Sequence, residues 1–247
     1  MVRFRRSAGL RGLMPLGFAR SAGLVGGGGG GGIAATWSGE HTHWQSGTYQ
    51  FVKWNGSGNL NVTSNGAGLC DVIIVGGGAG ARWPGNGPYG SGGGGAGNCR
   101  HLIGVNLPIG SHTITVGAGN SPPSHSNGGQ SDLAAVFNSG NGWSPGAGNT
   151  LYAYGGGIGA HWPYGGPNGG GCGGGGDGQY TTGGPGNSPS LSPQTGFNGG
   201  NGSYQGNYGY YGGGGGGGSQ AAGMPHPYYM TYMAGGNVSQ EIGRAHV

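Results

Sequence analysis

Runs of glycine constrain this chain more than any other feature of its sequence. Glycine occupies 73 of the 247 positions, and uninterrupted runs recur in the second half of the chain at Gly155–Gly157, Gly169–Gly171, Gly173–Gly176 and Gly212–Gly218. Glycine contributes no side chain to a core and loses more conformational entropy on folding than any other residue. The glycine-rich part must therefore either stay unfolded or pack through its backbone.

Large apolar side chains are scarce, which favours packing through the backbone. Leu, Ile, Val and Phe together number only 35, too few for an ordinary core in a chain of this length. Charged residues make up 6% of the chain, whereas disordered chains usually carry many more. Glycine chains can form left-handed helices with three residues per turn, as collagen strands do. We expect the glycine-rich part to pack as extended helices of this polyglycine II type, joined by loops.

The front of the chain reads as conventional antiparallel β-structure. Thr48–Trp54 and Leu60–Thr63 alternate between apolar and polar residues, and Asn55–Gly58 between them is a turn signal. Leu69–Val75 is apolar at almost every position, which predicts a central strand covered on both faces. These segments predict a three-stranded meander.

Four further stretches complete an all-β fold of short antiparallel strands, a meander or sandwich that leads into the glycine-rich region. The predicted strands are Asn98–Leu107, His112–Val116, Ser131–Phe137 and Asn149–Tyr154. No stretch has the period of an amphipathic helix.

Composition divides the chain into four parts. Residues 1–32 are a basic, low-complexity segment with a glycine linker, and we expect them to be disordered. Residues 33–154 form the β-rich part, and residues 155–240 form the glycine-rich scaffold with aromatic loops. Residues 241–247 read as a translated sequencing adapter, so they carry no functional argument.

The stretch Asp71–Gly80 also resembles the first strand and phosphate turn of a flavin- or nicotinamide-binding fold. That fold needs a helix after the glycines, to hold the pyrophosphate at its N-terminus. Here Arg82–Gly90 follows, and its glycines and prolines oppose helix formation. The acidic residue expected about 20 positions on is also missing. A flavin- or NAD-binding oxidoreductase is therefore a remote alternative, and we expect no cofactor.

Charge and reactive residues argue against several other functions. Five arginines lie in the first twenty residues, but between Ser21 and Gln240 three basic residues stand against four acidic ones, which disfavours nucleic-acid binding. No apolar run is long enough to insert into a membrane. His41 and His43 lack further metal ligands, and the three scattered cysteines favour buried or idle thiols, with a single disulfide as the alternative. We therefore expect a non-enzymatic protein without a catalytic or metal site.

The order of segments resembles the glycine-rich domain of phage tail-fibre and tail-tip proteins over about Gly47 to Gly218. The residues that carry this resemblance are Tyr49–Phe51 with Gly58–Val62, Asp71–Gly80, Gly92–Gly97, Gly110–Gly119 and Asn127–Ser131. The resemblance implies a virion adhesin or fibre component whose partners are a host receptor or polysaccharide and other tail-fibre proteins. The domain also occurs in bacterial surface proteins, so a secreted or cell-wall structural protein is the alternative.

Tyr and Trp between the glycine runs supply the candidate contact residues. Such rings among Gly, Ser and Asn resemble the composition of antibody binding loops, which make large contacts with little entropy to lose. The alternative is that the rings only seal the ends of the glycine layers. The receptor-binding candidates are Trp83, Tyr89, Trp143, Trp162, Tyr164, Tyr204, Tyr208, Tyr210 and Tyr211.

Overall fold

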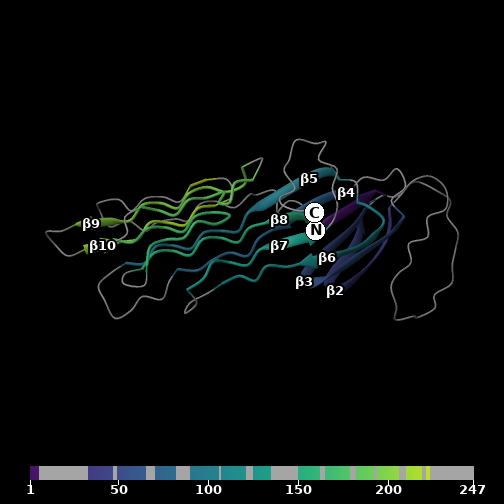
Figure 1. The fold of residues 1–247 in the computed structure, drawn as a ribbon, viewed down its shortest axis with the longest axis horizontal. Helices are drawn as coiled ribbons and strands as arrows, with labels where there is room; N and C mark the ends of the chain where they lie inside the picture. Colours follow the sequence, from purple (N-terminus) through teal and green to yellow (C-terminus); the bar gives the residue numbers. More distant parts are fainter. Residues whose placement is uncertain are drawn as a thin grey trace.

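The chain folds into a body of paired strands that continues into a set of extended glycine-rich segments (Figure 1). The computed structural model describes residues 1–5, 33–46, 49–64, 70–81, 90–105, 107–120, 125–134, 150–161, 165–178, 182–191, 194–205, 210–218 and 221–222. No helix occurs in these ranges and every strand pair is antiparallel, so the predicted all-β fold is confirmed. The strands are β1 (Val2–Arg5), β2 (Ala34–Ser46), β3 (Tyr49–Ser64), β4 (Cys70–Val75), β5 (Cys99–Val105), β6 (Gly110–Thr115), β7 (Ser131–Ala134), β8 (Thr150–Ala153), β9 (Ser203–Gln205) and β10 (Tyr210–Gly212).

Strand β3 organises the large sheet because it pairs with different partners along its length. The strand order is β5-β4-β1-β3-β6-β7-β8, and β2 also pairs with β3. Strand β1 pairs with residues 49–52 of β3, whereas β6 pairs with residues 58–62. Strands β4 and β7 are distant in this order but lie in contact, so the two halves of the sheet face each other. The hydrophobic core lies between them, with Val52, Leu60, Leu133 and Leu151 fully buried.

The turn predicted at Asn55–Gly58 is wrong, because these residues lie inside β3. The alternation of side chains continues through them: Trp54 and Leu60 are buried, while Ser57 and Asn59 are exposed. One 16-residue strand therefore replaces the first two strands of the predicted meander.

Gly58 in that segment allows strands β2 and β3 to approach each other closely, and it does not form a turn. Gly58 pairs with Gly39 of β2, and a Cβ on Gly58 would collide with the carbonyl oxygen of Ser38. Gly39 has a φ of 90°, which favours glycine. The pairing register shifts between Gly39 and His41, and such a bulge bends the strand. These two glycines therefore allow the paired strands β2 and β3 to bend, and the chain does not reverse its direction at this point.

Strand β4 is central, as predicted, since it pairs with both β1 and β5. Its inner face is buried, whereas its other face is only partly covered among the described residues, so the prediction that both faces are covered holds for one face alone. Val72 and Ile74 are buried, whereas Val75 is 42% exposed. The residues after Val75 continue without a helix, as predicted: the Gly76 amide donates to the Asn98 carbonyl and the Gly77 amide to that of Gly129.

Strand β1 corrects the prediction that residues 1–32 are disordered. Val2–Arg5 lies between β3 and β4 and pairs with both, and Val2 is buried in the core. The run of arginines hid the alternating pattern of this strand. The remainder of that segment, residues 6–32, lies outside the described residues.

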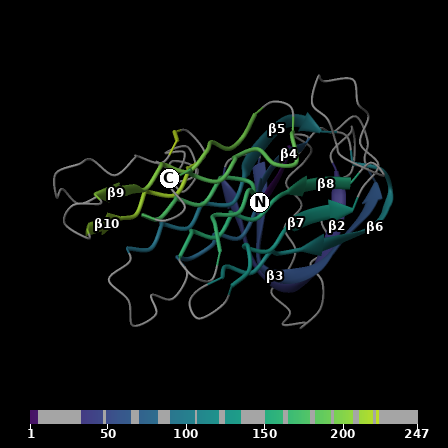
Figure 2. The ribbon, with the colours of Figure 1, turned by 60° about the vertical axis from the view of Figure 1, so that its left-hand side comes forward.

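The glycine segments form one bundle held by backbone hydrogen bonds, and both views show them side by side between the sheet and β9 (Figures 1 and 2). We call this set the glycine bundle; it comprises residues 76–81, 90–98, 117–120, 125–130, 154–161, 165–178, 182–187, 194–202 and 213–218. Successive segments run away from the sheet and back again. The bundle thus draws on glycines before and after residue 154, so the predicted boundary there does not separate two parts in space.

Hydrogen-bond donors in the glycine bundle repeat every third residue. Amides three residues apart donate to one neighbouring segment, and the amides next to them donate to another. In one segment the pairs are Gly92 to Ala160, Gly95 to Gly157 and Asn98 to Tyr154, with Gly93 to Gly214 and Ala96 to Gly217 between them. The same spacing gives Gly156 to Gly77 and Gly159 to Gly80, alternating with Gly157 to Cys172 and Ala160 to Gly175. A β-strand would show a period of two, whereas three is the period expected for a polyglycine II helix. That conformation itself stays a prediction.

Asparagine side chains supplement the backbone pairing between glycine segments. The Asn127 side chain accepts from the Ile158 amide at 3.1 Å and donates to the Gly169 carbonyl at 2.9 Å. Asn198 accepts from the Gly186 amide at 2.8 Å, and Asn201 from the Gly183 amide at 3.0 Å. A carboxamide carries the same donor and acceptor as a peptide group, so it can take the place of a backbone partner.

We expect Gly174→Ala to destabilise the fold by about 1–3 kcal/mol or more, the usual range for overpacking. A Cβ at this position would collide with the carbonyl oxygen of Ile158 in the neighbouring segment. The matched control is Gly78→Ala, whose Cβ would lie 4.0 Å from its nearest neighbour. Urea unfolding of both variants measures the difference, and equal stabilities would contradict backbone packing.

The buried Cys70 thiol predicts a loss of stability at alkaline pH. Burial, with the charge of Asp71 second, raises the pKa of Cys70 to about 12 from an ordinary 9.0. The folded state therefore holds this proton more tightly, and its contribution to stability is complete below pH 9 and is lost between pH 9 and 12. We expect the free energy of unfolding of the wild type to fall more steeply over that range than that of Cys70→Ala. Parallel slopes would contradict the burial of this thiol.

Candidate functional site

The glycine segments end close together on the side away from the large sheet. We call this region, residues 80–81, 90–92, 160–161, 165, 176–178, 200–205 and 210–214, the outer end. Backbone hydrogen bonds link its segments in series: Gly159 to Gly80, Gly92 to Ala160, Ala160 to Gly175, Gly176 to Gly200 and Gly214 to Gly176. Figure 1 shows β9 and β10 at the tip of this end, on the left of the molecule.

A buried histidine fixes two of these segments to each other. His161 is 1% exposed, and its Nδ1 lies 3.2 Å from the Ser91 hydroxyl. His161 and Gly165 also exchange two backbone hydrogen bonds of 3.1 Å, and Gly165 has a φ of 123°. The bases of the loops at residues 82–89 and 162–164 are therefore held together. Sequence reasoning missed this pair, because 70 positions separate the two residues and neither belongs to a local motif.

Strands β9 and β10 form a separate two-stranded sheet at the outer end. Tyr210 pairs with Gln205, Tyr211 with Tyr204 and Gly212 with Ser203. The Tyr204 side chain is 49% exposed, one of the most exposed large side chains among the described residues. A predicted contact residue is thus about half exposed at this end.

The structure places the bases of most of the predicted aromatic loops at the outer end. Trp83, Tyr89, Trp162, Tyr164 and Tyr208 themselves lie outside the described residues. The chain on either side of them, at Ala81, Ser91, His161, Gly165, Gln205 and Tyr210, belongs to the outer end. The backbone of Tyr210 and Tyr211 lies in β10.

Trp143 is the exception among the predicted contact residues. It also lies outside the described residues, but it belongs to the loop between Ala134 and Thr150. These two residues pair at the end of β7 and β8 that is remote from the glycine bundle. The base of this loop is therefore on the opposite side of the molecule from the others, and a single binding surface would not be expected to include Trp143.

Reactive groups elsewhere in the described structure have mainly structural surroundings. Burial raises the pKa of Cys172 to about 11, and a protonated thiol is a weak nucleophile and a poor metal ligand. His41 and His43 lie with their ring centroids 6.0 Å apart beside Trp37. Within the described ranges, three or more His, Cys, Asp or Glu side chains never gather closely enough to hold a metal ion. The same residues contain no helix that could cross a membrane.

The antiparallel fold, the backbone-bonded glycine segments and the loop bases at the outer end define an all-β glycine-rich protein. The family model described as "Glycine-rich domain" matches residues 55–243, about three quarters of the chain. The chain therefore belongs to the glycine-rich domain family. Comparison with curated proteins and with solved structures gave no match.

Proposed function

We propose that this protein is a non-enzymatic adhesive component of a phage tail fibre or tail tip. In this proposal the glycine bundle is a rigid stalk, and the aromatic loops at its outer end bind a glycan or another receptor on the host surface. The virion would be its location, and other tail-fibre proteins would be its structural partners.

One observation carries the proposal: loops rich in Tyr and Trp start from one end of a scaffold with little freedom to rearrange. Binding residues commonly lie on loops held by a rigid framework. The hydrogen bonds from Gly92 to Ala160 and from Gly214 to Gly176 hold the loop bases at fixed positions. Flat aromatic rings, such as the exposed Tyr204, bury a large area at low entropic cost.

The residues at the loop bases also support a binding role without catalysis. The histidine at the loop bases, His161, is buried against Ser91 and fastens two segments. A buried imidazole that bonds a neighbouring segment has a structural use.

We expect the double variant Trp162→Ala with Tyr164→Ala to weaken binding to bacterial cells or to an immobilised surface polysaccharide sharply. Central aromatic anchors are commonly worth about 2 kcal/mol or more each. Tyr204→Ala is expected to weaken binding less, since it removes one half-exposed ring, whereas the double variant removes two rings. Binding is measured by pull-down on a panel of cells and on a glycan array.

Trp44→Ala is the matched control for this experiment. Trp44 stacks on Phe51 with the ring centroids 5.1 Å apart, on strands β2 and β3 of the large sheet. The Trp44→Ala substitution removes the same type of side chain far from the outer end, so this variant is expected to bind as the wild type does. Equal losses in the control and the double variant, or losses that only follow a lower melting temperature, would contradict a binding surface at the outer end.

A further inference from the structure

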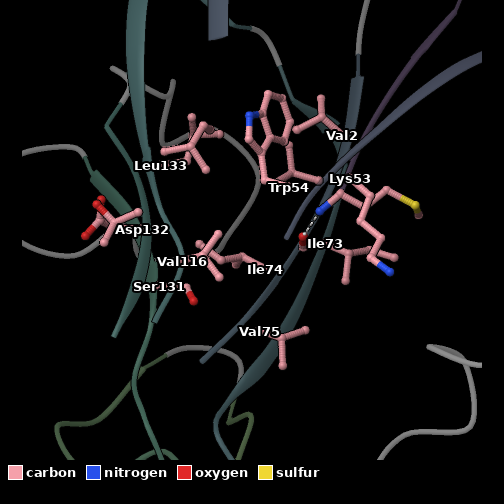
Figure 3. A pocket seen from close by; sticks show the side chains of 14 residues that line it. Val2, Lys53, Trp54, Ile73, Ile74, Val75, Val116, Ser131, Asp132 and Leu133 are labelled. Carbon is pink, nitrogen blue, oxygen red and sulfur yellow. Dashed lines mark hydrogen bonds between the residues drawn. The ribbon is translucent and has the colours of Figure 1, made fainter. Parts of the chain in front are cut away.

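A cavity of about 310 Å³ lies between the two halves of the large sheet, next to the point where they continue into the glycine bundle (Figure 3). Val2, Trp54 and Ile74 line it from one half of the sheet, and Ile114, Val116 and Leu133 line it from the other. It is far from the outer end of the bundle, so it has no part in the loops considered above.

Branched aliphatic side chains make up more than half of the residues that line the cavity. Val2, Ile74, Ile114 and Leu133 are buried, and Val116 packs against the same core. Trp54 adds the only aromatic ring to these walls, and its indole nitrogen is already bonded to the Ser38 carbonyl at 3.1 Å. The cavity therefore offers apolar contact surface and few hydrogen bonds to a ligand.

This space is a pocket that is partly open to solvent, since the exposed residues Val75 and Lys53 belong to its lining. Protein interiors are close-packed, with few voids larger than a water molecule. Apolar cavities do not hold water well, and one of about 150 Å³ in another protein binds benzene or xenon. Volumes near 300 Å³ and mostly apolar linings are typical of small-molecule sites. These properties favour a ligand with an apolar body.

Two charged side chains belong to the described lining, and they lie on opposite sides: Lys53 on one and Asp132 on the other (Figure 3). Burial lowers the pKa of the Met1 amino group, which also lines the cavity, to about 6 from 8.0, so this group adds little positive charge at pH 7. The Met1 amino group donates to the Ile73 carbonyl at 2.7 Å. Lys53 is exposed, so its ammonium can reach a ligand end that emerges from the cavity. An anionic end group would lie on this side, away from Asp132.

We propose that this cavity binds a small amphipathic molecule with an aliphatic body and a carboxylate end, of the medium-chain fatty-acid class. The aliphatic chain lies between the buried side chains of the two sheet halves. The carboxylate lies beside Lys53. This site is independent of the adhesive function proposed above, because it uses none of the residues of the outer end.

The test uses the full chain with decanoate as the probe, measured by isothermal titration calorimetry and by displacement of the fluorescent anion 1-anilinonaphthalene-8-sulfonate. We expect saturable binding of one decanoate per chain. Val116→Phe places a ring into the cavity from a half-buried position, so it is expected to weaken decanoate binding at least about 10-fold, or about 1.4 kcal/mol. Ile103→Phe makes a comparable change at a residue that is 68% exposed and does not belong to the cavity lining, and it is expected to bind as the wild type does.

A second comparison separates the apolar part of the site from the charged part. Lys53→Gln is expected to weaken decanoate binding about 2- to 5-fold, the range for an exposed ion pair, and to leave the binding of neutral decanol unchanged. Amide chemical-shift changes on decanoate addition are expected on β4 and β7. Absence of saturable binding overturns the proposal, as does equal binding by folded Val116→Phe and wild type. An equal effect of Lys53→Gln on both probes overturns the assignment of the carboxylate end.

Discussion

The backbone hydrogen bond between neighbouring glycine segments is the interaction on which this structure depends. Each segment donates alternately to different neighbours, for example from Gly92 to Ala160 and from Gly93 to Gly214. The segments lie so close that a Cβ at most of the inner positions would overlap a neighbouring peptide group. Glycine is therefore required here for its missing side chain, and the large entropy that it loses is offset by many mutually supporting peptide contacts. This arrangement explains how a chain with so few large apolar residues can still be ordered.

The sequence predicted those parts of the fold in which the pattern of apolar and polar side chains reflects their burial. The alternation in His112–Val116 and the apolar run in Leu69–Val75 located β6 and β4, since burial selects residue types face by face. Strand β1 was hidden by its arginines, and the turn expected at Asn55–Gly58 failed because a glycine also serves where two strands approach closely. In the glycine bundle, identical residues carry no information about which segment lies beside which, so its neighbours could not be derived.

The candidate site could likewise be predicted only in part from the sequence. Composition alone selected the aromatic loops, because Tyr and Trp stand out against glycine. Composition could not indicate that the loop containing Trp143 starts at the opposite end, since this depends on the pairing of Ala134 with Thr150. Nor could it find the contact between Ser91 and His161, or the apolar cavity beside Leu133, because both join strands distant in the sequence.

The three-residue spacing of donors sets a rule for how such chains can vary in length. One residue inserted between Gly92 and Gly95 would break the three-residue spacing of donors and direct every later amide to the wrong neighbour. Insertions of three residues would restore the directions, whereas loops beyond the outer end are free of this periodicity. Natural variation in related chains should therefore keep segment lengths in phase and change loop lengths freely. Such a division would let the loops diverge in sequence and length while the supporting lattice is inherited unchanged.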